Sequence, residues 1–423
     1  MIMKFYQLSR ADRLTWLKQA GYLTDESEQR LLAQTPLAEA VLSAMVENSL
    51  SEFGLPMGVA DHFLIDGHEY FVPMVTEEPS VIAAASNGAK RVAASGGFQT
   101  VEVSHLLKAQ VIINGVTNQV SLTKRLTDAQ SAIETVVIEA HPSLQKRGGG
   151  LRQIEINHFA DGYSELALWI DPVAAFGANM ANTIAEAVGT YIQQALLKKD
   201  EQVLAAVLSN SGEKMTVTVT CQVDFTQLAT AEFSGQQVAL KIAALNHYAA
   251  LDIDRAATEN KGILNGIFAV GLATGNDLRA ISAAVTDYLC GANRPVLSTW
   301  QLDQHAEVLR GRLTIPLPVG RVGGAINSLP NAQVSLELLQ HPSVETLMSI
   351  IASVGLANNL AALRALVTNG IQAGHMALQT ANLAIQAGAT GEEIGWVQQQ
   401  LNQHQPANLA LAQQLLQQFR NRG

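Results

Sequence analysis

The chain has 423 residues, of which 48% are hydrophobic and 15% charged, so it is long enough for two domains or for one large core with an insertion. This composition excludes a disordered chain, and the net charge of −10 argues against a nucleic-acid partner, which requires clustered lysine and arginine. The two cysteines, Cys221 and Cys290, are isolated in the sequence. They match no metal-binding spacing and favour a reducing compartment, so we expect no metal.

The N-terminal part predicts helices without a targeting segment. Apolar residues follow Ser and Asp caps at helical spacing over residues 6–47, which we interpret as a helical appendage. The first residues show no apolar stretch with a cleavage site, so we expect a mature cytoplasmic start. The longest uncharged apolar stretch, residues 348–363, is shorter than the ~20 residues that cross a bilayer, so no membrane span is expected.

Residues 53–75 predict a turn, a strand, an Asp-Gly turn and a second strand. Residues 77–95 predict a helix with Pro79 in its first turn, where a missing N–H costs little. The next segment alternates strands and helices in the order β-α-β-β-α, which suits a small α/β domain inserted into a larger one. Its expected elements are strands at 105–115, 151–160 and 165–173, helices at 121–141 and 177–197, and a closing strand at 213–225.

The remainder is expected to complete the larger domain and to end in helices. The pattern predicts a helix at 239–252, two further helices through 289, strands around 296–316 and a long helix from 344. Residues 376–423 are glutamine-rich and expected to be helical, with glycines at 370, 374, 388 and 391 as links.

Three short stretches place ionisable groups among glycines and small apolar residues: Glu78, Lys261 and Asp277. A partly desolvated lysine requires a carboxylate, which Asp277 could supply, and burial could raise the pKa of Glu78. Each residue also has an ordinary interpretation. Glu78 could be a macrodipole partner in a first helical turn, Lys261 a solvated surface charge, and Asp277 or Asn276 a helix cap.

His375 stands between a glycine and a methionine in the largely apolar and amide segment 356–384. Taken by itself, this segment allows His375 to be either a core histidine or a proton donor on a mobile segment. An imidazolium is a suitable acid near neutral pH, and the neighbouring glycines favour a hinge.

Ten short motifs follow one another along the chain and closely resemble the bacterial class II type of 3-hydroxy-3-methylglutaryl-CoA (HMG-CoA) reductase. The resemblance extends from about residue 40 to the C-terminus. The motifs include EEPSVIAAAS (77–86), GANMANTIAEAV (177–188), NKGILNG (260–266), ATGNDLRA (273–280), PLPVGRVGGA (316–325) and VGLANNLAALRALVTNGIQAGHMAL (354–378). The resemblance implies reduction of HMG-CoA to mevalonate and free CoA with two NAD(P)H, or the reverse oxidation, through hemithioacetal and aldehyde intermediates. It also implies a homodimer with interfacial active sites.

The implied fold is α+β, with a large mixed substrate domain, an inserted small ferredoxin-like, non-Rossmann nicotinamide-binding domain and a C-terminal helical flap. The expected boundaries are 1–104 for the N-terminal helices and first part of the large domain, 105–215 for the small domain, 216–372 for the second part of the large domain, and 373–423 for the flap.

The resemblance also implies roles for individual residues. Glu78, Lys261, Asp277 and His375 match the family's catalytic residues, and Ser80, Arg255 and Asn265 match its substrate contacts. Relatives that prefer NADH carry an acidic residue just before the GGG loop. Here His141 stands at that position, and Ser143, Lys146 and Arg147 follow, which favours the 2′-phosphate of NADPH, with NADH as a possible second cofactor.

Gly177 and Asn179 match the family's pyrophosphate contacts, whereas Ala174 replaces its usual acidic residue. Lys146 and Arg147 could instead be solvated loop residues, which leaves dual specificity open. Two other functions make different demands on the sequence. A CoA acyltransferase would need a poised cysteine, and a degenerate binding protein would lack one of the four catalytic residues, all of which are present.

Overall fold

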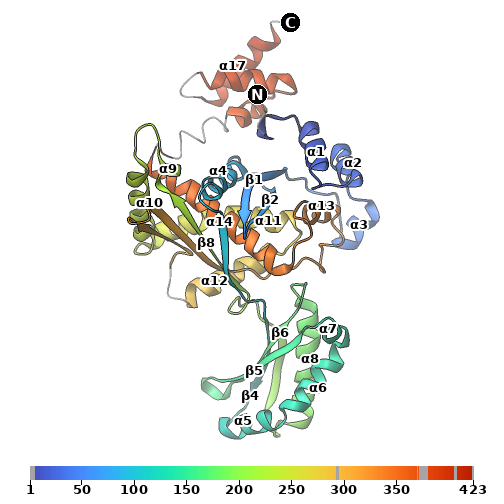
Figure 1. The fold of residues 1–423 in the computed structure, drawn as a ribbon. Helices are drawn as coiled ribbons and strands as arrows, with labels where there is room; N and C mark the ends of the chain where they lie inside the picture. Colours follow the sequence, from blue (N-terminus) through green and yellow to red (C-terminus); the bar gives the residue numbers. More distant parts are fainter. Residues whose placement is uncertain (1–4, 292–294, 369, 371–379, 404–406, 422–423) are drawn as a thin grey trace.

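The computed structural model describes residues 5–291, 295–368, 370, 380–403 and 407–421. The fold is mixed α+β, as expected, and consists of three bodies arranged in a column (Figure 1). The large body in the middle contains a six-stranded sheet, the small body below it contains a four-stranded sheet, and the C-terminal body above it is helical.

The predicted N-terminal helices are present, and the first of them packs on the large body. They are α1 (Arg10–Gln19), α2 (Asp25–Ala33) and α3 (Glu39–Met45). Ser9 caps α1 and Thr24 caps α2, each by accepting a backbone N–H with its side-chain oxygen. Leu14 and Leu17 pack against α13 (Pro330–Leu338), a helix that the sequence pattern did not predict. The appendage is therefore fixed by a hydrophobic cluster.

The six-stranded sheet has the order β2-β1-β3-β8-β10-β9. The predicted hairpin of β1 and β2 is confirmed, with Asp66 and Gly67 at its turn, both at positive φ. Neighbouring strands are antiparallel except at β1 and β3. The strands are β1 (Met57–Ile65), β2 (His68–Val75), β3 (Phe98–Val103), β8 (Thr216–Asp224), β9 (Ser298–Asp303) and β10 (Val308–Pro316).

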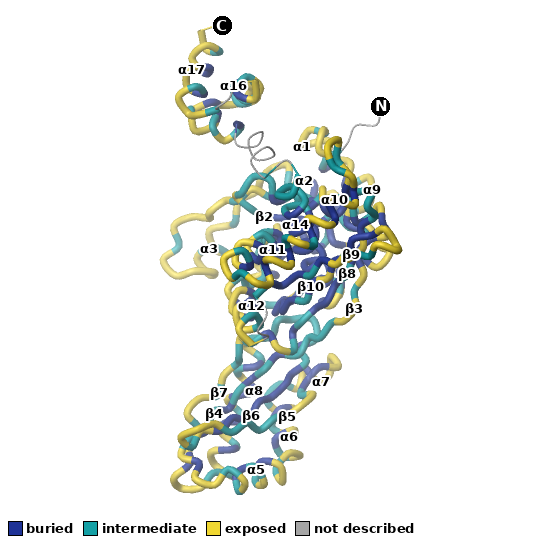
Figure 2. Tube along the Cα trace, turned by 90° about the vertical axis from the view of Figure 1, so that its left-hand side faces the viewer, coloured by how far each residue is buried: buried dark blue, intermediate teal, exposed yellow. Residues whose placement is uncertain are grey.

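Helix α14 (Val344–Val367) runs through the core of the large body (Figure 2). Gly88 lets α4 approach it closely, because a Cβ at this position would lie 2.2 Å from the carbonyl oxygen of Ala357. Among the described helices, α14 is long and apolar enough to cross a membrane, and 67% of its most apolar window is buried inside the protein. Around it lie α4 (Val81–Ala93), α9 (Phe225–Leu228), α10 (Gly235–Ala249), α11 (Ile253–Ala273) and α12 (Leu278–Gly291).

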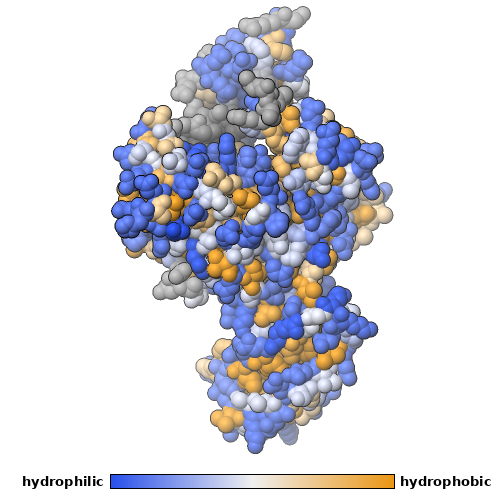
Figure 3. Space-filling view, viewed as in Figure 1, coloured by the Kyte–Doolittle hydropathy of each residue, from blue (hydrophilic) through white to orange (hydrophobic). Residues whose placement is uncertain are grey.

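The small body carries a sheet of order β5-β6-β4-β7, in which all neighbours are antiparallel. Hydrophobic side chains gather over it on the face seen in Figure 3, and the long helices pack on the sheet through a separate core. Its elements are β4 (Leu107–Asn114), α5 (Gln119–Asp128), α6 (Gln130–Ala140), α7 (Pro142–Lys146), β5 (Gly150–His158), β6 (Ser164–Asp171), α8 (Ala178–Ala195) and β7 (Gln202–Leu208).

Two expectations for this region are wrong. The strand that closes the small sheet is β7, whereas the predicted strand at 213–225 is β8 of the large sheet. β7 is an edge strand whose residues are all exposed or only partly buried, so its hydrophobic alternation is weak. The predicted helix at 121–141 is also broken in two at Ala129, whose φ and ψ of −94° and 5° lie outside the helical region.

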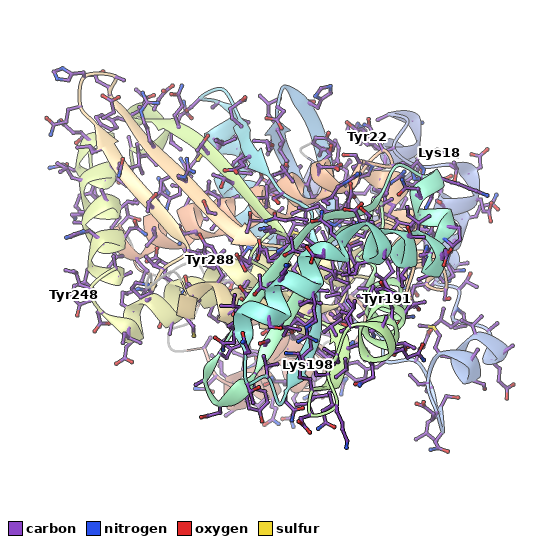
Figure 4. The ribbon with its side chains drawn as sticks, turned by 90° about the horizontal axis from the view of Figure 1, so that it is seen from below. Lys18, Tyr22, Tyr191, Lys198, Tyr248 and Tyr288 are labelled. Carbon is purple, nitrogen blue, oxygen red and sulfur yellow. The ribbon has the colours of Figure 1, made fainter. Side chains whose placement is uncertain are left out.

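The chain crosses between the large and small bodies twice, and the two crossings are hydrogen-bonded to each other. Ser104 N donates to the carbonyl oxygen of Thr216, and Leu106 N donates to the carbonyl oxygen of Lys214. Both donor–acceptor distances are 2.8 Å. In Figure 4, seen from below, the small body with Tyr191 and Lys198 lies in front of the large sheet. Because these two hydrogen bonds join them, the two crossings form a short two-stranded ribbon between the bodies.

The C-terminal body is helical, as expected. It contains α16 (Glu392–Leu401) and α17 (Leu409–Arg420), which enclose a small core of its own. Arg420 bonds both carboxylate oxygens of Glu393, over 2.7 and 2.9 Å.

Candidate active site

Lys261 and Glu78 form an ion pair on the surface of the large body. The Lys261 Nζ lies 2.9 Å from Glu78 Oε2, although the two residues are 183 positions apart in the sequence. The side chains are 63% and 36% exposed, so the expected burial of Glu78 is wrong. The pair lies open to solvent, where a substrate can reach both groups.

The segment before α4 explains how Glu78 reaches this position. The predicted first turn is wrong, because α4 begins at Val81, and Pro79 precedes the helix instead of lying inside it. Ser80 has a φ of 83°, a left-handed conformation that is strained for a residue with a Cβ. Glu78 N donates to Thr76 Oγ1 over 3.1 Å. Thr76 therefore holds Glu78 in a turn that precedes α4, outside the first turn of the helix.

Two adjacent asparagines of α14 fix the elements that carry the ion pair. Asn358 Nδ2 donates to the carbonyl oxygen of Val81 over 3.0 Å, at the start of α4. Asn359 Nδ2 donates to Glu259 Oε1 over 3.3 Å, two residues before Lys261 on α11. The sequence analysis missed both roles. The available signal was a pair of amides in an otherwise apolar helix, which requires hydrogen-bond partners once it is buried.

Arg255 and Asn265 lie on α11 with Lys261. Arg255 is in the first turn, after the Asp252 cap, and its Nε lies 3.9 Å from Glu259 Oε2. Asn265 follows Lys261 by four residues, so the two share a face of the helix, and Asn265 is partly buried. Three of the predicted site residues therefore lie along one helix.

Asp277 does not contact Lys261 within this chain. About 18 Å of α11 lies between Lys261 and the helix end at Ala273, at 1.5 Å rise per residue. Asn276 N bonds the carbonyl oxygen of Gly271, which keeps the following loop at that end. Asp277 instead accepts the backbone N–H groups of Arg279 and Ala280 and pairs with the Arg279 guanidinium over 2.7 Å.

An open groove of about 900 Å³ lies beside Asp277, lined mainly by α12. Phe268 and Leu278 form part of its apolar wall, and Arg279 lies at its edge with an 88% exposed side chain. His375 lies outside the described residues.

The GGG loop of the small body packs directly against the loop that precedes α8. A Cβ on Gly149 would lie 2.6 Å from the carbonyl oxygen of Asp171 and 2.6 Å from Val173 Cγ2. Val173 has a φ of 61°, an outlier for a β-branched residue, and its N–H bonds Asp171 Oδ1 over 2.9 Å. The two loops therefore pack closely through their backbones, and we call this contact the Gly149 cradle.

The predicted cofactor residues surround this cradle. Gly177 precedes α8 with a φ of 90°, and Asn179 is exposed in its first turn. His141 joins α6 to α7, and its Nδ1 lies 3.3 Å from Ser143 Oγ. Lys146 and Arg147 end α7 with exposed side chains, directly before the GGG loop. These basic residues are therefore available to an anionic ligand.

Substitution of Gly149 by alanine is expected to raise KM for the nicotinamide cofactor at least tenfold. The added methyl group would meet the backbone oxygen of Asp171, which cannot rotate away, so the two loops must separate. KM is measured at a saturating concentration of the acyl-CoA substrate that the sequence resemblance implies. Gly148 offers the matched control with an open environment, although its φ of 86° makes alanine mildly strained there. An unchanged cofactor KM in Gly149→Ala would contradict the assignment of the cradle.

The segment after β10 connects the cradle to the loop of Asp277. Gly320 N donates to Asn276 Oδ1 over 2.8 Å, and Arg321 N donates to the carbonyl oxygen of Ala174 over 2.9 Å. His105, in the first crossing between the bodies, bonds the carbonyl oxygen of Val319 with its Nε2 over 3.1 Å. This segment accounts for the PLPVGRVGGA motif as a link between the two bodies.

The cysteines offer little support for an acyl-transfer site. Cys221 is buried in β8, and burial raises the pKa of its thiol to about 12, so the nucleophilic thiolate is not formed near neutral pH. Cys290 is exposed near the end of α12, on the groove beside Asp277. Within the described ranges, no group of three or more His, Cys, Asp or Glu side chains is arranged to hold a metal ion.

Comparisons with known proteins identify the family and the fold of the chain. A family model described as hydroxymethylglutaryl-coenzyme A reductase matches residues 9–380. The chain is 36% identical over 420 residues to 3-hydroxy-3-methylglutaryl-coenzyme A reductase of Archaeoglobus fulgidus, which covers 99% of this chain and 94% of that relative.

Solved structures of 3-hydroxy-3-methylglutaryl-coenzyme A reductase from Streptococcus pneumoniae have the same fold as this chain. One superposes with a TM-score of 0.82 at 37% identity, covering 98% of this chain and 99% of the other. A second, described as the class II enzyme bound to NADPH in open conformations, gives a TM-score of 0.81 at 37% identity, covering 98% and 100%. The chain therefore belongs to the hydroxymethylglutaryl-coenzyme A reductase family, the NADPH-dependent oxidoreductases that reduce HMG-CoA to mevalonate.

Proposed function

We propose that the Lys261–Glu78 pair is the centre at which this chain reduces HMG-CoA to mevalonate and free CoA. The observation that best supports this proposal is the 2.9 Å contact between Lys261 Nζ and Glu78 Oε2, in a position open to solvent. Two NADPH molecules, bound one after the other, would each supply one hydride. The protein must then stabilise negative charge on an oxygen, protonate a leaving thiolate and protonate the final alkoxide.

Lys261 stabilises the charge that develops on the thioester carbonyl oxygen. A fixed ammonium near such an oxygen lowers the barrier most when closure of the site removes water. Glu78 holds the ammonium in place in the open state. In the second reduction, a protonated Glu78 gives its proton to the aldehyde oxygen.

His375 protonates the CoA thiolate as the hemithioacetal collapses. An imidazolium is a suitable acid near neutral pH, and a thiolate leaves more readily once protonated. Residues 373–423 serve as a helical flap that carries this histidine over the site and opens between the two reductions, so that the spent cofactor can be exchanged.

Asp277 of the partner subunit approaches Lys261 in a homodimer. Helix α11 separates Asp277 from Lys261 within one protomer, and Asp277 lies beside an open, partly apolar groove that a second subunit would cover. Arg255, Ser80 and Asn265 contact the substrate acyl group. The strained φ of Ser80 supports this role, because such strain concentrates at functional sites.

Residues 105–215 form the nicotinamide-binding domain, of ferredoxin-like topology and without a Rossmann fold. The strand order β5-β6-β4-β7 supports this proposal, and the Gly149 cradle supports phosphate binding there. Residues 1–104 and 216–372 form the large CoA-substrate domain with its N-terminal helices. The protein acts in the cytoplasm, which its similarity to bacterial and archaeal reductases supports.

NADPH is expected to support reduction of HMG-CoA at least tenfold more efficiently than NADH. Lys146 and Arg147 can bond the 2′-phosphate, and a charge-assisted hydrogen bond contributes about 1.5–3 kcal/mol. The comparison is made by following the loss of nicotinamide absorbance and deriving kcat/KM for each cofactor.

The double substitution Lys146→Ala, Arg147→Ala should abolish this preference by lowering the rate with NADPH and leaving the rate with NADH unchanged. Equal efficiencies in the unmodified protein would contradict the role given to residues 141–147. No HMG-CoA-dependent oxidation of either cofactor would contradict the proposed function itself.

A further inference from the structure

Glu259 is a buried carboxylate on α11, between Arg255 and Lys261, and only 2% of its surface is exposed. Three neutral donors from three different elements converge on its Oε1. These are Asn246 Nδ2 of α10 at 2.7 Å, Ser298 Oγ of β9 at 3.2 Å and Asn359 Nδ2 of α14 at 3.3 Å. The orientation of this carboxylate is therefore fixed from the core side.

The two asparagines are themselves held in one orientation. Asn246 Oδ1 accepts the backbone N–H of Trp300 over 2.9 Å, and Asn359 Oδ1 accepts the indole N–H of Trp300 over 2.6 Å. Because both amide oxygens are occupied by Trp300, both NH₂ groups must point towards Glu259. These donors satisfy hydrogen bonds but carry no net charge, so they leave the negative charge of Glu259 uncompensated.

The second oxygen of Glu259 faces Arg255. Glu259 Oε2 and Arg255 Nε are both buried, and neither has a hydrogen-bond partner among the described residues. They lie 3.9 Å apart, about 1 Å beyond the length of a charge-assisted hydrogen bond. Burying a carboxylate or a guanidinium edge without a hydrogen-bond partner lowers the stability of the folded protein. Here each group is the partner that the other lacks.

We propose that Glu259 is a positioning residue that holds the Nε edge of Arg255, so that the outer fork of the guanidinium faces the free carboxylate of the substrate. The proposal rests on the proposed function, in which Arg255 binds that carboxylate. A guanidinium has five N–H donors in one plane, so one edge can bond Glu259 while two parallel N–H groups bond a second carboxylate. Glu259 acts through Arg255 and does not touch the substrate.

The substitution Glu259→Gln tests this role, because it keeps the shape of the side chain and removes its charge. KM for HMG-CoA is expected to rise about tenfold or more, with kcat changed less than about threefold and KM for NADPH unchanged. The matched control is Glu201→Gln in the small body, where another buried glutamate pairs with Arg125 over 2.7 Å. This control should lower stability without changing KM for HMG-CoA.

Two inhibitors separate positioning from a general loss of structure. Free 3-hydroxy-3-methylglutarate carries the carboxylate that Arg255 would bind, whereas free CoA lacks it. In Glu259→Gln, the inhibition constant of 3-hydroxy-3-methylglutarate should rise in parallel with KM, and that of CoA should stay constant. Equal increases for both inhibitors and for NADPH would mean that Glu259 is only structural, and would overturn the proposal.

The substitution Arg255→Lys provides a test that does not require the buried carboxylate to change. It keeps a positive charge but removes Nε, so KM for HMG-CoA should rise to a similar extent, and adding Glu259→Gln should cause little further increase. Additive effects would overturn the positioning role. If Arg255→Lys leaves KM unchanged, the role of Arg255 in the proposed function fails, which is a different result from failure at Glu259 alone.

Discussion

Replacement of Lys261 by methionine is expected to lower kcat for HMG-CoA reduction by about 10²–10³-fold, the loss typical for removal of a preorganised group that stabilises a developing oxyanion. Methionine has a similar length and no charge. The stability of the fold should change by no more than about 1 kcal/mol, because an exposed ion pair contributes about 0–1 kcal/mol and the lysine side chain is 63% exposed. A large effect on rate combined with a small effect on Tm is the diagnostic result.

The rate is measured as HMG-CoA-dependent oxidation of NADPH, and stability is measured by thermal unfolding. Lys18→Met is the matched control, since Lys18 pairs with Asp25 and Glu28 on the N-terminal helices (Figure 4). It should leave kcat unchanged. A kcat within threefold of the unmodified protein in Lys261→Met would remove Lys261 from the mechanism.

Glu78→Gln is expected to lower kcat by about 10²–10⁴-fold, the range for loss of a general acid. Glutamine can still accept a hydrogen bond from Lys261, but it has no acidic proton to give to the aldehyde oxygen. Since Glu78 is 36% exposed and its pair partner is more exposed still, stability should change little. The measurement is kcat with saturating HMG-CoA and NADPH.

The control for this substitution is Glu155→Gln in the small body. Glu155 pairs with Lys214 over 2.8 Å and has a similar exposure, so the chemical change is the same at a site without a proposed catalytic role. If Glu78→Gln and Glu155→Gln have the same kcat, Glu78 is not the proton donor.

Elements that depend on local sequence were predicted well. The β1–β2 hairpin and the N-terminal helices carry their own turn and cap residues, so neighbouring residues are sufficient to specify them. By contrast, β7 becomes a strand by pairing with β4 along the edge of the small sheet, and its own sequence does not alternate clearly. Long-range pairing is what local periodicity cannot supply.

The active site shows the same difference between what local sequence specifies and what long-range contacts specify. The contact between Glu78 and Lys261 joins residues 183 positions apart, and only the resemblance to a known family brought them together in advance. Asp277, the carboxylate that the sequence offers to Lys261, is separated from it within the chain by the length of α11. Glu259 was missed because its donors come from α10, β9 and α14, and no local pattern distinguishes it from a surface glutamate.

The ribbon that joins the small and large bodies has an architectural consequence. β3 and β8 leave the large sheet side by side, with Val103 opposite Val217, so a tight turn of a few residues can replace everything between them without breaking a strand of that sheet. A chain shortened in this way keeps a continuous six-stranded sheet. The intervening segment, residues 104–216, is thus a contiguous insertion whose entry and exit lie at adjacent points of one sheet.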